Sequence, residues 1–158
     1  HYRLFFGRNS DYYLEIVKKQ NSNKNMPFSA VAFIFGLFWM LYRKLFRLIP
    51  FVFLLLLIEA VIEQTIYELT NTTDTVESIV DKTSWLLWAF IFGAFGNQFY
   101  LKMADRKITK IISLELPEKE TNEKIKKAGG TTLIPHLFIG VLLILAFYLA
   151  NQGLINIG

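Results

Sequence analysis

The sequence predicts an all-α integral membrane protein, a helical bundle of three spanning helices plus one short re-entrant or interfacial segment. The first reason is composition: 53% of the residues are hydrophobic and only 19% are charged, against about 45–50% and 25% in soluble domains. The second is distribution, because the apolar residues gather in four blocks with polar segments between them. Helices are expected because a segment in lipid must satisfy its own backbone groups.

Residues 1–27 are predicted to form an N-terminal cytoplasmic or interfacial arm with one short helix. Ser10 or Asp11 can cap a helix that ends near Gln20. Tyr12 and Ile16 share one face of that helix, which suits docking on the bundle or on the headgroup layer. A solvated arm is an equal alternative.

Residues 28–150 are predicted to form the membrane domain, followed by a short tail at 151–158. The first block, 28–42, has 15 residues, fewer than the roughly 17–25 that a spanning helix needs. The remaining three blocks are long enough to cross, and they are 48–69, 84–101 and 131–150.

The charges between the blocks predict an orientation. Segments 43–47 and 102–127 are basic and should be cytoplasmic, whereas loop 70–83 is acidic and should be external. If 28–42 crosses, the basic arm lies outside; if it is re-entrant, every basic segment is inside. We therefore favour three spans, with four spans as the alternative.

An internal repeat is visible. Residues 32–38 match residues 89–95 at six of seven positions, and Leu-Ile-Pro follows at 48–50 and again at 133–135. The matching order of both elements favours an internal duplication. The repeat also supports the four-span alternative, because the counterpart of the first block is predicted to cross.

Two carboxylates lie within the second block. Glu59 comes eleven residues after Leu48, about 16 Å along a helix and so near the middle of the bilayer. A charge there costs about 2.5–3.5 kcal/mol on insertion scales. Glu63 follows one turn later, while Asn97 and His136 lie shallow on the cytoplasmic side. These four residues are candidates for a proton or cation path, but structural hydrogen bonds between helices are the favoured interpretation.

Two further sets of residues are predicted to be structural. Small residues spaced for close helix contact form the first set, namely Ala32, Gly36, Ala89, Gly93 and Gly96. Aromatic and basic residues at the block ends form the second set, the interface anchors Trp39, Tyr42, Arg43, Lys44, Trp85, Trp88 and Tyr100.

Several classes of chemistry have no signal in the sequence. There is no cysteine and there are only two histidines, so no metal-ligand set and no thiol nucleophile is predicted. No phosphate-binding loop, dinucleotide fingerprint or nucleophile elbow is present, and we predict no catalytic residue and no cofactor. The net charge is +4, but the basic residues flank the blocks, so we expect a lipid bilayer as partner rather than nucleic acid.

The assembled motifs resemble the bacterial family called domain of unknown function 2628. The resemblance rests mainly on residues 28–39 running into Tyr42-Arg43-Lys44, with weaker matches at 12–13, 96–100 and 129–130. The sequence departs from the usual family pattern at Ser29, Ala30 and Leu37. The resemblance implies a small bacterial inner-membrane protein and supplies no activity.

The function expected from the sequence is that of a non-enzymatic, multi-pass protein of the bacterial cytoplasmic membrane. It would act through packing and partners, in an accessory, assembly or immunity-like role, as a homo-oligomer or with another protein. The alternative is a small oligomeric channel or a proton- or cation-linked transporter that uses the intramembrane carboxylates. A third reading is a lipid-surface protein that uses segment 102–127.

Overall fold

The computed structural model describes residues 1–22 and 26–151, and these residues form helices and connecting turns without a strand. The predicted tail, apart from Asn151, lies outside the described residues. The elements in chain order are α1 (Tyr2–Phe6), the 3₁₀ helix η1 (Gly7–Asn9), α2 (Ser10–Asn21), α3 (Ala30–Tyr42), α4 (Ile49–Thr70), α5 (Asp74–Ile112), α6 (Glu118–Ala128) and α7 (Ile134–Asn151).

Two of the described helices, α4 and α7, are long and apolar enough to cross a membrane by length and composition, one fewer than predicted. The predicted block 84–101 is the middle of α5, a helix of 39 residues. Its Trp, Gly, Asn and Gln residues make it less apolar than α4 or α7. The first block forms α3, which has 13 residues and is interrupted at Gly36, where φ is 45° and ψ is −118°.

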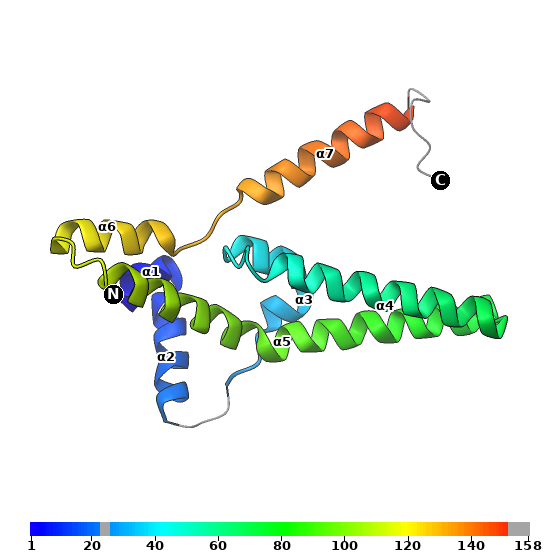
Figure 1. Ribbon diagram of the computed structural model, residues 1–158, viewed down its shortest axis with the longest axis horizontal. Helices are drawn as coiled ribbons and strands as arrows, with labels where there is room; N and C mark the ends of the chain where they lie inside the picture. The colour runs from blue at the N-terminus through cyan, green and yellow to red at the C-terminus, as the bar shows by residue number, and fades with distance from the viewer. Residues whose placement is uncertain (23–25, 152–158) are drawn as a thin grey trace.

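Helices α4 and α5 form a long antiparallel hairpin (Figure 1). The chain turns at Asn71, which adopts the left-handed conformation with φ 47° and ψ 46°. Asn tolerates this conformation better than most residues because its short polar side chain bonds locally. None of the residues of α4 is buried by the rest of the described chain.

Helix α3 packs against the middle of α5, and small residues make the approach close. A Cβ atom built on Gly96 would lie 2.8 Å from the Cβ of Ala32, and one built on Gly93 would lie 2.2 Å from the Phe28 ring. Ala89 is also buried. The Ser29 amide donates to the carbonyl of Gly93 at 2.8 Å, which fixes where α3 begins along α5.

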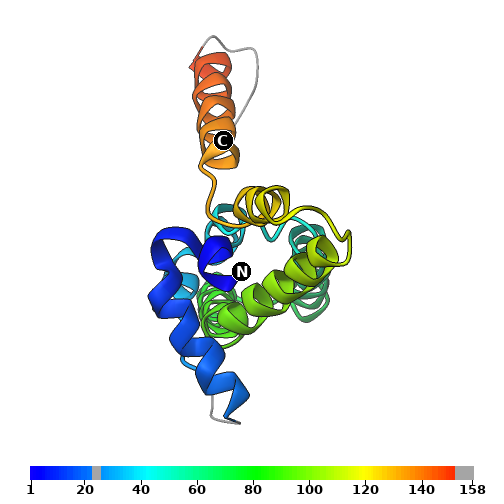
Figure 2. The ribbon, with the colours of Figure 1, turned by 90° about the vertical axis from the view of Figure 1, so that its left-hand side faces the viewer.

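The buried core lies at the end of the molecule away from the α4–α5 turn, where α1, α2, α6 and the C-terminal part of α5 come together (Figures 1 and 2). We call these four elements the helical head. Along this part of α5, Leu101, Ala104 and Ile108 are buried on one stripe, as in an amphipathic helix of a soluble domain. The remaining large side chains of the head core are Phe5, Phe6, Tyr13, Ile16, Trp39, Met40, Leu45, Tyr100 and Ile125.

A glycine pair allows α1 to meet the end of α6. A Cβ atom on Gly129 would lie 2.1 Å from the backbone oxygen of Phe5, so only glycine fits there. The next amide, that of Gly130, donates to the same Phe5 oxygen at 2.7 Å. This contact closes the head around the N-terminal helix.

Helix α7 projects away from the other helices (Figures 1 and 2). It is attached near its first turn, where the Thr132 amide donates to the carbonyl of Tyr42 at 3.0 Å. Its large apolar residues are exposed along its length, from Ile134 to Tyr148.

Candidate functional site

The two predicted carboxylates of α4 bond to α5. The Trp88 indole Nε1 donates to Glu59, and the Ser84 hydroxyl donates to Glu63. One turn beyond, the Tyr67 hydroxyl donates to Asp81 at 3.1 Å. The three pairs form a polar ladder between the two antiparallel helices, because residues three or four apart share a helix face.

Asn97 belongs to a different contact. Its side chain is fully buried, and Nδ2 donates to the carbonyl of Pro27 at 2.9 Å and to the Tyr12 hydroxyl at 3.1 Å. The amide therefore holds both the arm helix and the segment before α3 against α5. Within the described residues, Asn97 Oδ1 has no hydrogen-bond partner.

His136 lies at the junction of α7 with α3. Its Nε2 atom is 3.0 Å from the carbonyl oxygen of Phe38, which can only accept, so Nε2 carries the proton. The imidazole also lies against the rings of Phe38 and Tyr42, with centroids 5.9 and 6.3 Å away. The four predicted polar residues thus do not join one path. Glu59 and Glu63 bond to α5, Asn97 bonds to the arm and to Pro27, and His136 bonds to the end of α3.

Arg43, predicted as an interface anchor, is instead buried in the helical head with 5% exposure. Its guanidinium carbon lies 4.9 Å from the ring centroid of Tyr13, 5.2 Å from that of Tyr100 and 5.6 Å from that of Tyr42. The negative faces of these rings stabilise the cation in place of a carboxylate. Burial raises the pKa of Tyr13, and the positive charge of Arg43 partly opposes that rise.

The other predicted anchors differ in exposure. Trp39 and Tyr100 are buried at 4% and 0% exposure, which corrects the prediction, since an anchor must present its ring to the headgroups. Trp88 is half-buried against Phe92 and bonds to Glu59. Trp85 is 67% exposed and can act as an anchor. Burial of the first two rings follows from the head core, which the arm and α6 complete.

Lys44 caps α6 rather than facing the bilayer. Its Nζ donates to the carbonyls of Gly129 at 2.5 Å and Lys127 at 3.2 Å, and Lys107 donates to Ala128 at 3.4 Å. Cations are favourable at a helix C-terminus, where carbonyls lack partners. Burial lowers the pKa of Lys107, and the charges of Lys44 and Arg47 lower it further.

Sequence reasoning missed the contribution of the N-terminal segment. Phe5 and Phe6 are at 0% and 1% exposure in the head core, although they precede the predicted arm helix. The signal that was present is the Gly129-Gly130 pair, which permits a close approach by another segment. No local pattern indicates which segment that is.

The comparison with known protein families agrees with the motifs. The family described as "Protein of unknown function (DUF2628)" matches residues 12–106. The chain belongs to the DUF2628 family. The DUF2628 match covers α2 through most of α5, and so includes Arg43, its three tyrosines and Asn97. No curated protein and no solved structure matches the chain.

Proposed function

We propose that this DUF2628 protein is a non-enzymatic, multi-pass protein of the bacterial inner membrane, whose cytoplasmic helical head binds a partner protein in an accessory or assembly role. The observation that carries the proposal is the division of the chain into two environments. Helix α4 exposes apolar side chains along its length, while the buried core is concentrated in the head.

The apolar helices support the membrane location. Helix α4 has 22 residues, about 33 Å of helix, which matches the roughly 30 Å hydrocarbon core. An exposed apolar surface of this size is unfavourable in water. Because α5 bonds to α4 at three successive turns, α5 crosses wherever α4 does. With α7, this gives three spans, and α3 is the short segment that does not cross.

The charge distribution supports the orientation. Most of the basic residues lie in three segments, the arm, the 43–47 connector and α6. All three segments belong to the head or border it. The opposite end, at the α4–α5 turn, carries Asp74, Glu77 and Asp81. Basic segments stay in the cytoplasm, which supports a head on the cytoplasmic side.

The channel alternative draws less support from the geometry. Glu59 and Glu63 each accept a hydrogen bond from α5, so these carboxylates join the hairpin. A cation path would need carboxylates turned toward a water-filled space. The head, in contrast, exposes charged faces of α2 and α6 that a soluble partner can contact.

Membrane insertion and orientation can be tested together. The chain has no cysteine, so single substitutions report location without background. We expect Thr73→Cys to react with an impermeant maleimide added outside intact cells, and Glu123→Cys and Ser22→Cys to react only after lysis. Ala104→Cys, at a buried position, is the control for unfolding. Release of the protein by alkaline carbonate, or reaction of Glu123→Cys from outside, would contradict the proposal.

The partner role needs its own test. Photo-crosslinking residues placed at exposed Lys119 and Glu123 of α6 should give one discrete adduct in cells. The same photo-crosslinking amino acid placed at exposed Leu143 of α7 is the lipid-facing control and should not give that adduct. Adducts only with a second copy would replace the accessory role with a homo-oligomer.

A further inference from the structure

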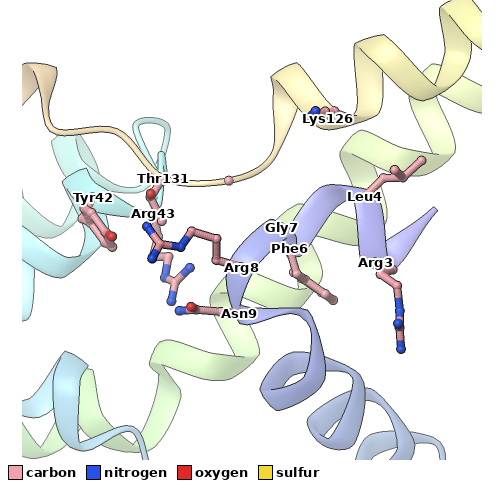
Figure 3. A pocket seen from close by; sticks show the side chains of 11 residues that line it. Arg3, Leu4, Phe6, Gly7, Arg8, Asn9, Tyr42, Arg43, Lys126 and Thr131 are labelled. Atoms are coloured by element: carbon pink, nitrogen blue, oxygen red, sulfur yellow. The ribbon is translucent and has the colours of Figure 1, made fainter.

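A basic pocket opens on the helical head where the arm meets the ends of α3 and α6 (Figure 3). Its volume is about 710 Å³. The lining comes from α1, η1, the residues that end α3, the last turn of α6 and the segment between α6 and α7. It includes Arg3, Arg8, Asn9, Tyr42, Arg43, Lys126 and Thr131.

The charge of this pocket is uncompensated. Four of its lining residues are cationic and none is acidic. Arg3 forms an ion pair with Asp11 at 3.5 Å and turns away from the other guanidinium groups (Figure 3). The other ion pairs among residues 1–22 and 26–151 join Lys19 to Glu15 and Lys124 to Glu120. Arg8, Arg43 and Lys126 therefore have no carboxylate partner within the described chain.

Arg43 is the distinctive member of this set. It is 95% buried, since its exposure is 5%, and its Nε and Nη1 atoms have no hydrogen-bond partner among the described residues. Aromatic faces offset part of the cost of burying a cation. They do not accept the planar pattern of N–H bonds that a guanidinium presents, so the Arg43 guanidinium keeps unused hydrogen-bonding capacity in the wall of the pocket.

The donors match a phosphate group. Arginine binds phosphate oxygens through two parallel N–H bonds, and the guanidinium groups of Arg8 and Arg43 come together in the view of Figure 3. Asn9 and Thr131 add a neutral amide and a hydroxyl at the same part of the pocket. A carboxylate ligand would use one fork, whereas a phosphate has enough oxygens for both.

The position of the pocket indicates one source of that group. Tyr42 ends the apolar helix α3, and Thr131 lies three residues before α7. The Thr132 amide bonds to the Tyr42 carbonyl, so the pocket sits where two apolar helices meet the head. If those helices lie in the bilayer, which rests on the proposed function, this is the depth of the lipid headgroups.

We propose that this pocket is a binding site for an anionic phosphate group, presented by a lipid headgroup or by a soluble phosphate compound. The binding is electrostatic and bidentate, and Arg8 and Arg43 are its principal donors. Zwitterionic phosphatidylcholine binds less well, because its choline adds a cation to a pocket that is already positive.

The test uses the full chain purified in a neutral detergent. Titrations with inorganic phosphate, glycerol 3-phosphate, dihexanoyl phosphatidylglycerol and dihexanoyl phosphatidylcholine are followed by calorimetry. Arg43 is part of the core, so the informative variant is Arg8→Gln at an exposed position. Arg106→Gln is the matched control, since Arg106 is exposed on α5 and does not line the pocket.

We expect saturable binding that Arg8→Gln weakens by about tenfold, the usual effect of losing one charge-assisted hydrogen bond, and that Arg106→Gln leaves unchanged. Binding of all three anionic compounds would show a site for soluble phosphate; binding of phosphatidylglycerol alone would show a headgroup site. Equal binding of phosphatidylcholine, equal losses in both variants, or no saturable binding would overturn the proposal. Arg8-dependent binding of glycerol 3-phosphate would survive even if carbonate extraction disproved membrane insertion.

Discussion

Arg43, directly after α3, holds its guanidinium carbon 4.9 Å from the ring centroid of Tyr13 on α2. The contact joins the arm to the connector that follows the first apolar block. Two segments in contact lie on the same side of any membrane, so under the proposed topology α3 does not cross the bilayer. Helix α3 is also interrupted at Gly36, so its residues do not form one straight helix.

This contact predicts a specific order of stability among Tyr13 variants. Tyr13→Phe keeps the ring face over Arg43 and should change stability little. Tyr13→Leu removes the face and leaves a buried cation with less compensation, which should cost about 2 kcal/mol more than the Phe variant. Thermal unfolding in detergent measures the difference. Equal losses in the two variants would mean that the ring only fills space.

The α3–α5 contact predicts that a single methyl group at Gly96 is destabilising. The added Cβ would lie 2.8 Å from the Cβ of Ala32 and 3.3 Å from the Trp39 ring, so Gly96→Ala should cost about 1–3 kcal/mol by overpacking. Gly140→Ala is the control, because nothing lies within 4 Å of its Cβ and alanine favours a helix. A neutral Gly96→Ala would show that α3 and α5 separate readily.

The sequence predicted the helical class and the long apolar helices α4 and α7, because apolar periodicity and length act locally. It also predicted a third spanning helix at 84–101, where the structure has the less apolar middle of α5. Ala32 and Gly96, predicted to permit close helix contact, lie where α3 meets α5. The sequence did not predict that Trp39, Arg43 and Tyr100 are buried. Their burial depends on Phe5, Phe6 and Ile125, which reach them from distant segments. A basic or aromatic residue beside an apolar block has the same local pattern whether it faces lipid or a docked arm.

The α4–α5 hairpin also depends on contacts that local sequence patterns do not predict. Glu59 was expected near mid-membrane, but its partner Trp88 was expected at an interface. The partner depends on the register of α4 against α5, which the turn at Asn71 sets. That turn contains three residues between the helices, and its length alone does not fix the rotation of one helix about its axis. The pairing therefore required the three-dimensional structure.

A pH dependence is expected from Tyr2. Its hydroxyl donates to Asp105 at 2.5 Å, and this hydrogen bond is the main cause that raises the pKa of Tyr2 to about 12. The folded state thus favours the neutral phenol. The contribution of this hydrogen bond to stability is complete below pH 10, the usual pKa of tyrosine, and is lost as pH rises from 10 to 12.

Comparison with Tyr2→Phe checks this expectation. The thermal midpoint of the wild type should exceed that of Tyr2→Phe at pH 8, and the gap should close by about pH 12. Asp105→Asn keeps an acceptor but removes the charge. The difference in thermal midpoint between Asp105→Asn and Tyr2→Phe should therefore close at a lower pH. A gap that is constant from pH 8 to 12 would exclude the Tyr2–Asp105 contribution.

The last prediction concerns the polar ladder of the hairpin. Glu59→Gln keeps an oxygen for the Trp88 indole and should be nearly silent in stability. Glu59→Leu leaves that donor without a partner and should cost about 1–3 kcal/mol. Replacing both partners, Glu59→Leu with Trp88→Phe, should cost less than the sum of the single changes, because no buried donor remains.

Ion flux in proteoliposomes separates the structural role of Glu59 from conduction. A structural carboxylate predicts that wild-type vesicles leak protons no faster than empty ones, and that Glu59→Gln changes nothing. A conducting carboxylate predicts flux that disappears in Glu59→Gln while the thermal midpoint stays the same, because the amide keeps the bond to Trp88 but does not ionise. We expect the first pattern, since Glu59 and Glu63 both bond to α5 and the ladder accounts for two costly charges within an apolar helix.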